Sequence, residues 1–368
     1  MKRKRSSGYY KVFYCAAIIV AAVFMTEFML RNIPYFKDKK EEQGWDRALV
    51  YYDSILGWKF LPDGNVNCVT SEYNVNYKTN SKGLRDKEYD YDKPRGKFRI
   101  VCLGDSVTFG WGVSAEERFT EILENKFRNV EVINMGVPAY GVDQMLLFLK
   151  REGVKYNPDL VIVYLIHEDL RRVFYSTFGG APKPLFGLCG DNKLALLNVP
   201  LRRGTAVSNS MINRIKYNFM KKSYIFYYLC IVKDKIDMMA SGIKISVNKD
   251  DRPRLIEAIF KDMKMTSLSV NAKLQIVGSM PEEIRKFFIK NDIYFMDDPL
   301  SMYKGGADKI FYPKDRHPNA YGQRLIAEGM YDFCVKNSLM PGYKKSWEKD
   351  AAGIQPQAFL SQEKFYEH

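Results

Sequence analysis

The chain has 368 residues, a formal net charge of +14 and six cysteines. Apolar residues make up 46% of it and charged residues 27%, which is ordinary for a globular protein and excludes a disordered chain. The length suffices for one large α/β domain or two smaller ones. The positive charge suits acidic polysaccharide, anionic lipid or nucleic acid. No aromatic-interleaved motif favours nucleic acid, so we expect no nucleic-acid partner.

The cysteines are scattered and form no C-x-x-C pair, so a zinc or redox site is not indicated. Cys15 and Cys102 lie in apolar runs and are interpreted as small hydrophobic residues. A disulfide between Cys68 and Cys189 is an alternative that the sequence leaves open.

An apolar segment near the start of the chain follows a basic tail. Residues 12–30 are apolar except for Thr26 and Glu27, and residues 1–11 contain Lys2, Arg3, Lys4 and Arg5. The segment is just long enough to span a bilayer, and the positive-inside rule places residues 1–11 in the cytoplasm. We therefore expect a single-pass membrane protein with its main domain extracytoplasmic. A cleaved signal peptide is the alternative, but no small-x-small cleavage site is visible. A core helix is disfavoured because no amphipathic face is visible.

Residues 31–96 are polar, aromatic and rich in turn residues, and we interpret them as a stalk with an N-terminal strand addition. Residues 73–77, YNVNY, alternate with period two and predict one strand of a small antiparallel sheet. Residues 80–83, NSKG, are interpreted as a turn.

Residues 97–337 alternate between strand and helix patterns. The sequence predicts an α/β fold with a three-layer, doubly wound parallel sheet, because buried strand-length runs are separated by helical spacings. Strands are expected at residues 98–103, 130–133, 160–165, 274–277 and 293–296, and helices at residues 119–127, 142–149, 252–265 and 282–290 and after residue 319.

Residues 170–250 break this rhythm and are interpreted as a helical and loop insertion. An aromatic helix is expected around residues 213–239. Packing of this helix on the domain is favoured, while a cap over the site and a face resting on the membrane remain open. Residues 338–368 have no periodicity and are expected to be a loose tail.

Two features of the sequence point to nucleophilic catalysis. Ser106 follows Gly104-Asp105 at the end of a predicted strand, where a sharp turn into a helix would present its hydroxyl. A serine nucleophile needs a base, and the chain has only three histidines. His317 is the best placed of them, because Asp315, two residues earlier on the same loop, can orient its imidazole.

Three blocks resemble the SGNH (GDSL-type) hydrolase family, and they occur in the family's order. Residues 104–110, GDSVTFG, resemble the first block; residues 134–136, NMG, the second; and residues 315–319, DRHPN, the last. Upstream, LGW at residues 56–58 and NSKGLRD at residues 80–86 are similar to a membrane-anchored subgroup associated with envelope polysaccharide.

The resemblance implies a flavodoxin-like hydrolase fold and a role for each matching residue. Ser106 would be the nucleophile, His317 its base and Asp315 the orienting acid, with the N–H groups of Ser106 and Gly136 forming the oxyanion hole. The activity would be that of an esterase or O-acyltransferase on ester groups, O-acetyl above all, of an exported polysaccharide. The implied partners are an acylated carbohydrate or another ester, the membrane and polysaccharide-assembly proteins, and no metal or organic cofactor is implied.

One departure from the family pattern concerns the third block. Glu168 stands where the family usually has an asparagine that donates to the oxyanion. An ionised carboxylate there would repel the developing charge, and losing one such donor costs roughly 3 kcal/mol. Either His167, Arg171 or Arg172 supplies a donor, or the chain is a catalytically impaired binding or scaffold protein of polysaccharide assembly.

Overall fold

The structure is a computed structural model of the chain. It describes residues 6–33, 35–36, 49–178, 181–201, 219, 222–230, 232 and 247–340.

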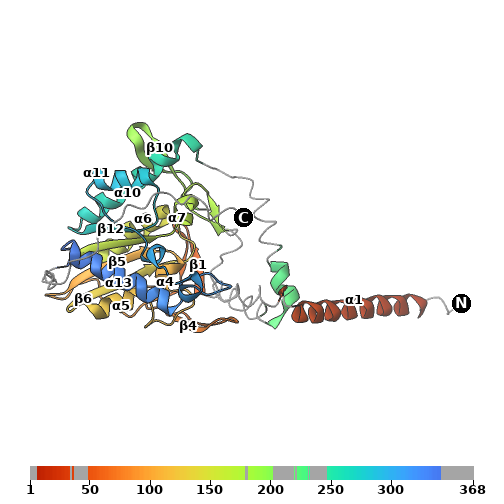
Figure 1. Cartoon of the computed structure of the whole chain (residues 1–368). Helices are drawn as coiled ribbons and strands as arrows, with labels where there is room; N and C mark the ends of the chain where they lie inside the picture. The colour runs from red at the N-terminus through yellow and green to blue at the C-terminus, as the bar shows by residue number, and fades with distance from the viewer. Residues whose placement is uncertain are drawn as a thin grey trace.

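A five-stranded parallel sheet forms the centre of the molecule (Figure 1). Its order is β13-β12-β7-β5-β6, so the chain runs outward from β5 to β6 and then returns to β7 on the other side of β5. The bounds are β5 Phe98–Gly104, β6 Val130–Gly136, β7 Leu160–Leu165, β12 Lys273–Gly278 and β13 Tyr294–Met296. This is the flavodoxin-like order, in which ligands bind where the strand order reverses, at the carboxyl ends of the strands.

Helices cover both faces of the sheet, which confirms the predicted three-layer α/β fold. Along β5 the side chains alternate: Val101 and Leu103 belong to one apolar cluster, and Ile100 and Cys102 belong to the other. The first cluster packs under α6 Val142–Arg151, α10 Arg252–Leu268 and α11 Glu282–Lys290, and the second under α5 Phe119–Lys126 and α13 Ala320–Lys336.

Short helices connect these elements at several points. They are α4 Ser106–Phe109, α7 His167–Arg172 and α12 Ala307–Ile310, with 3-10 turns η1 Gly153–Tyr156, η2 Gly190–Asn192, η3 Lys249–Asp251 and η4 Pro299–Met302.

Two hairpins before the sheet belong to the folded domain. The first pairs β1 Val50–Asp53 with β2 Gly57–Phe60, and the second pairs β3 Asn65–Val69 with β4 Asn74–Lys78. Trp58 and Tyr77 are buried in the same apolar cluster as Val101 of the central sheet. β4 occupies the segment where the period-two pattern predicts a strand, and its Val75 and Tyr77 face inward.

The insertion after α7 begins with two further small hairpins. They are formed by β8 Thr177–Phe178 with β9 Ala181–Pro182, and by β10 Phe186–Cys189 with β11 Lys193–Leu196. The fully buried Lys183 ammonium donates to Asp143 of α6 and so ties this insertion to the domain. The disulfide alternative is wrong: Cys68 is buried, Cys189 is exposed, and no disulfide joins the two.

The N-terminal helix α1, Ser6–Asn32, projects away from the domain in Figure 1. Its segment Tyr10–Asn32 is long and apolar enough to cross a membrane, as a single anchor or as a signal sequence. Most of the helix expected around residues 213–239 lies outside the described residues. Its described part lies against α1, where the carboxylate of Glu27 accepts hydrogen bonds from the backbone N–H groups of Tyr224 and Ile225 at 2.9 Å each.

Candidate active site

Ser106 stands at the carboxyl edge of the sheet, at the first turn after β5. Asp105 caps the short helix α4, because its carboxylate accepts a hydrogen bond from the N–H of Val107 at 3.0 Å. Gly110 ends the helix with a φ of 80°, a left-handed conformation that glycine adopts without a steric penalty. The β-strand, the cap and the glycine thus fix the turn that carries the serine.

The loop between α12 and α13 brings His317 to Ser106. Nε2 of His317 lies 2.8 Å from Oγ of Ser106, and Nδ1 contacts Oδ1 of Asp315. Asn319 caps α13 by accepting from the N–H groups of Tyr321 and Gly322, which fixes the end of the loop. Residues 211 positions apart therefore form a serine–imidazole–carboxylate chain with the contacts that nucleophilic catalysis requires.

Asp315 receives further donors on its second oxygen. Tyr73 donates its hydroxyl proton to Oδ2, and Nε1 of Trp111 lies 2.9 Å from the same atom. Burial alone would raise the pKa of Asp315, but the hydrogen bonds from His317, Tyr73 and Trp111 outweigh it and lower the pKa. The carboxylate therefore stays ionised beside the imidazole.

Gly136 lies at the end of β6, paired with Gly104 of β5. Its N–H donates to Oδ1 of Asn134 at 2.9 Å, so this N–H is already engaged. An oxyanion that accepts from this N–H would have to displace Oδ1 of Asn134. A Cβ at this position would lie 2.2 Å from the backbone nitrogen of Phe109, so α4 can approach β6 only because residue 136 is a glycine.

Glu168 faces solvent. Its side chain is 52% exposed and pairs with Arg171, and His167 at the start of the same helix α7 is also exposed. The expected repulsion of an oxyanion by Glu168 therefore finds no support in this placement. Helix α7 starts at His167, one residue before Glu168, and its first turn directs the side chain of Asp169 inward.

The half-buried Arg172 forms an ion pair with the buried Asp169 near the turn that carries Ser106. Arg172 also lies 3.3 Å from Asp105 and donates to the carbonyl of Tyr140 at 3.1 Å. Burial and the nearby Asp105 carboxylate raise the pKa of Asp169. Arg172 thus joins the residue before Ser106 to the loop after β6.

Sequence reasoning missed the part that Arg85 plays. Its buried guanidinium donates to the carbonyls of Phe109 at 2.8 Å and Val113 at 2.6 Å, and so holds the loop that follows Ser106. The sequence signal for Arg85 was the segment NSKGLRD, residues 80–86, which is similar to the membrane-anchored subgroup. Tyr73, whose hydroxyl contacts Asp315, gave no such signal.

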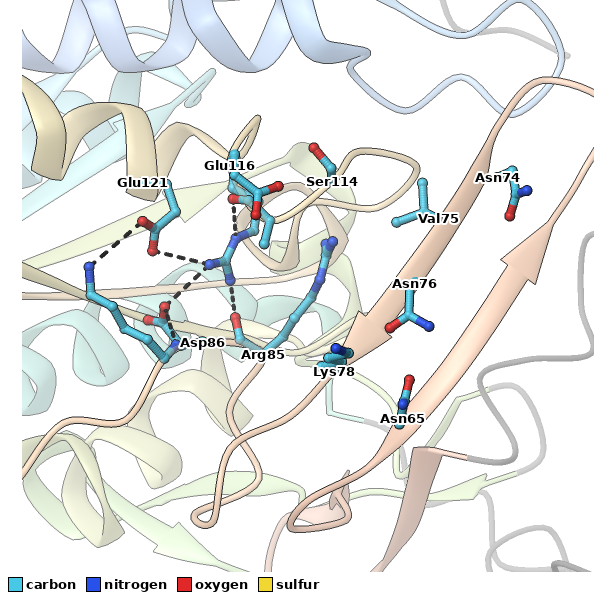
Figure 2. A pocket seen from close by; sticks show the side chains of 13 residues that line it. Asn65, Asn74, Val75, Asn76, Lys78, Arg85, Asp86, Ser114, Glu116 and Glu121 are labelled. Carbon is cyan, nitrogen blue, oxygen red and sulfur yellow. Dashed lines mark hydrogen bonds and ion pairs between the residues drawn. The ribbon is translucent and has the colours of Figure 1, made fainter.

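A pocket of about 630 Å³ lies on the other side of this loop, between the β3–β4 hairpin and α5 (Figure 2). Asn65, Asn74 and Asn76 line one side of it along the two strands, and Asp86 and Glu121 lie at the other. The residues that line this pocket do not include Ser106, Asp315 or His317.

Comparison with known proteins gives similarity at the level of solved structures. No family model matches the sequence, and no curated protein matches it. TesA is 11% identical, with 66% of this chain and 99% of that chain covered and a TM-score of 0.39. The esterase EstA from Pseudoalteromonas sp. is 13% identical, with 65% and 98% covered and a TM-score of 0.37. A family 3 carbohydrate esterase from Clostridium thermocellum is 12% identical, with 66% and 96% covered and a TM-score of 0.35. At this level none of them assigns an activity to this chain.

Proposed function

We propose that this protein is a serine esterase or O-acyltransferase of the SGNH type. The observation that carries the proposal is the 2.8 Å contact between Ser106 Oγ and His317 Nε2, with Asp315 on the other imidazole nitrogen. The three residues come from two of the blocks that resemble the family. They meet at the carboxyl edge of the parallel sheet, where this strand order places ligands.

The chemistry follows from the contacts. Ser106 Oγ attacks the ester carbonyl while its proton passes to Nε2 of His317, and Asp315 stabilises the imidazolium that forms. The tetrahedral intermediate then expels the alcohol, which takes the proton back from His317. The acyl-enzyme is released by water in hydrolysis or by a sugar hydroxyl in transfer.

We assign the N–H of Ser106, at the start of α4, to the oxyanion hole. For Gly136 we propose instead that the missing side chain lets α4 pack against β6, because Asn134 already accepts a hydrogen bond from the Gly136 N–H. The turn between β5 and α4 orients the Ser106 N–H together with its hydroxyl.

The proposed substrate is an O-acetylated or similarly esterified carbohydrate. The similarity of residues 56–58 and 80–86 to a subgroup associated with envelope polysaccharide supports this substrate class. We place the domain outside the cytoplasmic membrane, anchored by α1, in contact with a polysaccharide-assembly system.

The alternative of an impaired scaffold protein rested on Glu168, whose placement in solvent removes that support. The test uses the full chain in detergent with p-nitrophenyl acetate and then with O-acetylated xylan or chitosan oligosaccharides. We expect Ser106→Ala to reduce kcat/KM by about 10³-fold or more. Ser81→Ala, which removes an exposed hydroxyl bonded to Glu88, should match the wild type.

Acetate release from the oligosaccharides with water as acceptor would identify hydrolysis, and acetyl transfer to an unmodified oligosaccharide would identify the transferase. A wild type with no Ser106-dependent turnover and no labelling by a fluorophosphonate would contradict the proposal.

A further inference from the structure

The hairpin of β3 and β4 reaches the candidate triad from outside the central sheet. Its turn holds the loop that carries Asp315, since the carboxylate of Glu72 accepts from the backbone N–H groups of Lys314 at 2.9 Å and Asp315 at 2.8 Å. Lys314 in turn donates to the hydroxyl of Ser71 at 3.1 Å. Three consecutive residues of the hairpin, Ser71, Glu72 and Tyr73, therefore contact two consecutive residues of the loop.

Two aromatic side chains meet at the same carboxylate oxygen. Oδ2 of Asp315 accepts from the hydroxyl of Tyr73 and from Nε1 of Trp111, which also lies 2.8 Å from the Tyr73 oxygen. The Trp111 ring stacks on the His317 ring, with 5.1 Å between centroids and 20° between planes. Trp111 therefore contacts both members of the Asp315–His317 pair.

We propose that Tyr73 and Trp111 are positioning residues for catalysis, which fix the Asp315 carboxylate so that its other oxygen faces His317. This inference rests on the proposed function of the triad. A carboxylate can rotate about χ2, and two donors on Oδ2 leave Oδ1 for the imidazole. The hairpin that precedes the central sheet is then part of the catalytic apparatus.

The two donors also spread the negative charge of Asp315. Burial, followed by the contact with Asp315, raises the pKa of Tyr73, so the hydroxyl keeps its proton and remains a donor. Among the residues that the structure describes, other titratable or charged groups near the pair include Tyr77, Cys68, Glu72, Tyr312, Lys314 and Arg316. Removing the Tyr73 hydroxyl would leave more charge on Oδ1, and the imidazole would then hold its proton to a higher pH.

Tyr73→Phe in the full chain tests this, with Tyr77→Phe as the matched control. Tyr77 lies on the same hairpin and is buried, but its hydroxyl accepts from the N–H of Gly112 at 2.9 Å. We expect Tyr73→Phe to lower kcat/KM for p-nitrophenyl acetate by roughly tenfold. The acid limb of its pH–rate profile should move to higher pH by roughly 0.5 pH unit. Tyr77→Phe should leave the acid limb in place.

An NMR titration of the imidazole ring, which needs no turnover, separates this inference from the proposed function. The chain has three histidines, so a His317→Gln spectrum assigns the signal. A higher midpoint in Tyr73→Phe supports the inference even if no ester is cleaved. An imidazole midpoint in Tyr73→Phe that is unmoved or lower would show that Tyr73 only supports the fold. The same conclusion would follow if Tyr73→Phe and Tyr77→Phe had the same midpoint and the same loss of kcat/KM.

Discussion

At the scale of single residues, Gly136 shows how closely the nucleophile's helix packs on the sheet. A Cβ there would lie 2.2 Å from the backbone nitrogen of Phe109 and 2.6 Å from the carbonyl carbon of Thr108. Since backbone atoms cannot move aside as a flexible side chain can, we expect Gly136→Ala to lower the free energy of unfolding by about 1–3 kcal/mol. It should also reduce turnover by displacing Ser106.

Gly190→Ala is the control for Gly136→Ala, because a Cβ at Gly190 meets nothing within 4 Å. It should be neutral or stabilising by up to about 1 kcal/mol. Chemical denaturation of both variants measures the difference. Equal stability of the two proteins would mean that α4 does not approach β6 as described.

Glu168 gives a second prediction at this scale. Because its carboxylate is 52% exposed and pairs with Arg171, Glu168→Gln should change kcat/KM by less than about twofold and stability by less than about 0.5 kcal/mol. Asp169→Asn, one residue later, should lower both kcat/KM and stability far more, since the buried carboxylate accepts from the N–H of Ile166 and pairs with Arg172. A large gain of activity in Glu168→Gln would restore the view that this side chain blocks the oxyanion site.

The contrast between these two carboxylates also marks the limit of prediction from the sequence. The motifs around Ser106 and His317 are local: a strand and a tight turn position Ser106, and the loop that Asn319 ends by capping α13 carries His317. Whether Glu168 or Asp169 faces inward depends on where the helix begins, which a shift of one residue reverses. Tyr73 contacts Asp315 across 242 positions, and no spacing rule predicts a tertiary contact of that kind.

At the scale of elements, the sheet and its helices were the most predictable part. Buried parallel strands have continuous apolar runs, and β7 and α11 have the bounds that the sequence predicts. The short strands of the insertion after α7 were not predicted. Strands of two to four residues are too short to show an alternating apolar pattern in the sequence.

That insertion is tied to α6 by the buried pair of Lys183 and Asp143. Burial lowers the pKa of Lys183 and raises that of Asp143, so each charge depends on its partner. Lys183→Met would leave the carboxylate buried without its cation. We expect it to cost about 3–5 kcal/mol of unfolding free energy.

The double variant Lys183→Met/Asp143→Leu is the decisive comparison, because it removes both charges. It should be more stable than Lys183→Met alone, with a coupling free energy of about 1–3 kcal/mol from the double-mutant cycle. Additive losses would mean that the two side chains contribute independently and that the insertion is held by its apolar contacts.

At the scale of the whole molecule, α1 projects away from the α/β domain (Figure 1), and Glu27, which accepts from the N–H of Tyr224, lies near the C-terminal end of this helix. An apolar helix of 23 residues with its side chains exposed needs either lipid around it or removal by a peptidase. The sequence favours retention, because the residues that a signal peptidase recognises are not visible around residues 25–32.

We therefore expect the protein to stay in the membrane fraction after washing with alkaline carbonate, and its intact mass to include residues 1–30. A matched form in which residues 1–31 are replaced by a cleavable signal peptide should be released in soluble form with Ser106-dependent activity intact, since the triad lies entirely within residues 106–317. Wild-type protein found soluble and shortened by about 30 residues would identify a signal sequence. That result would contradict the proposed membrane anchor, and the proposed esterase activity would still be tested separately by Ser106-dependent turnover.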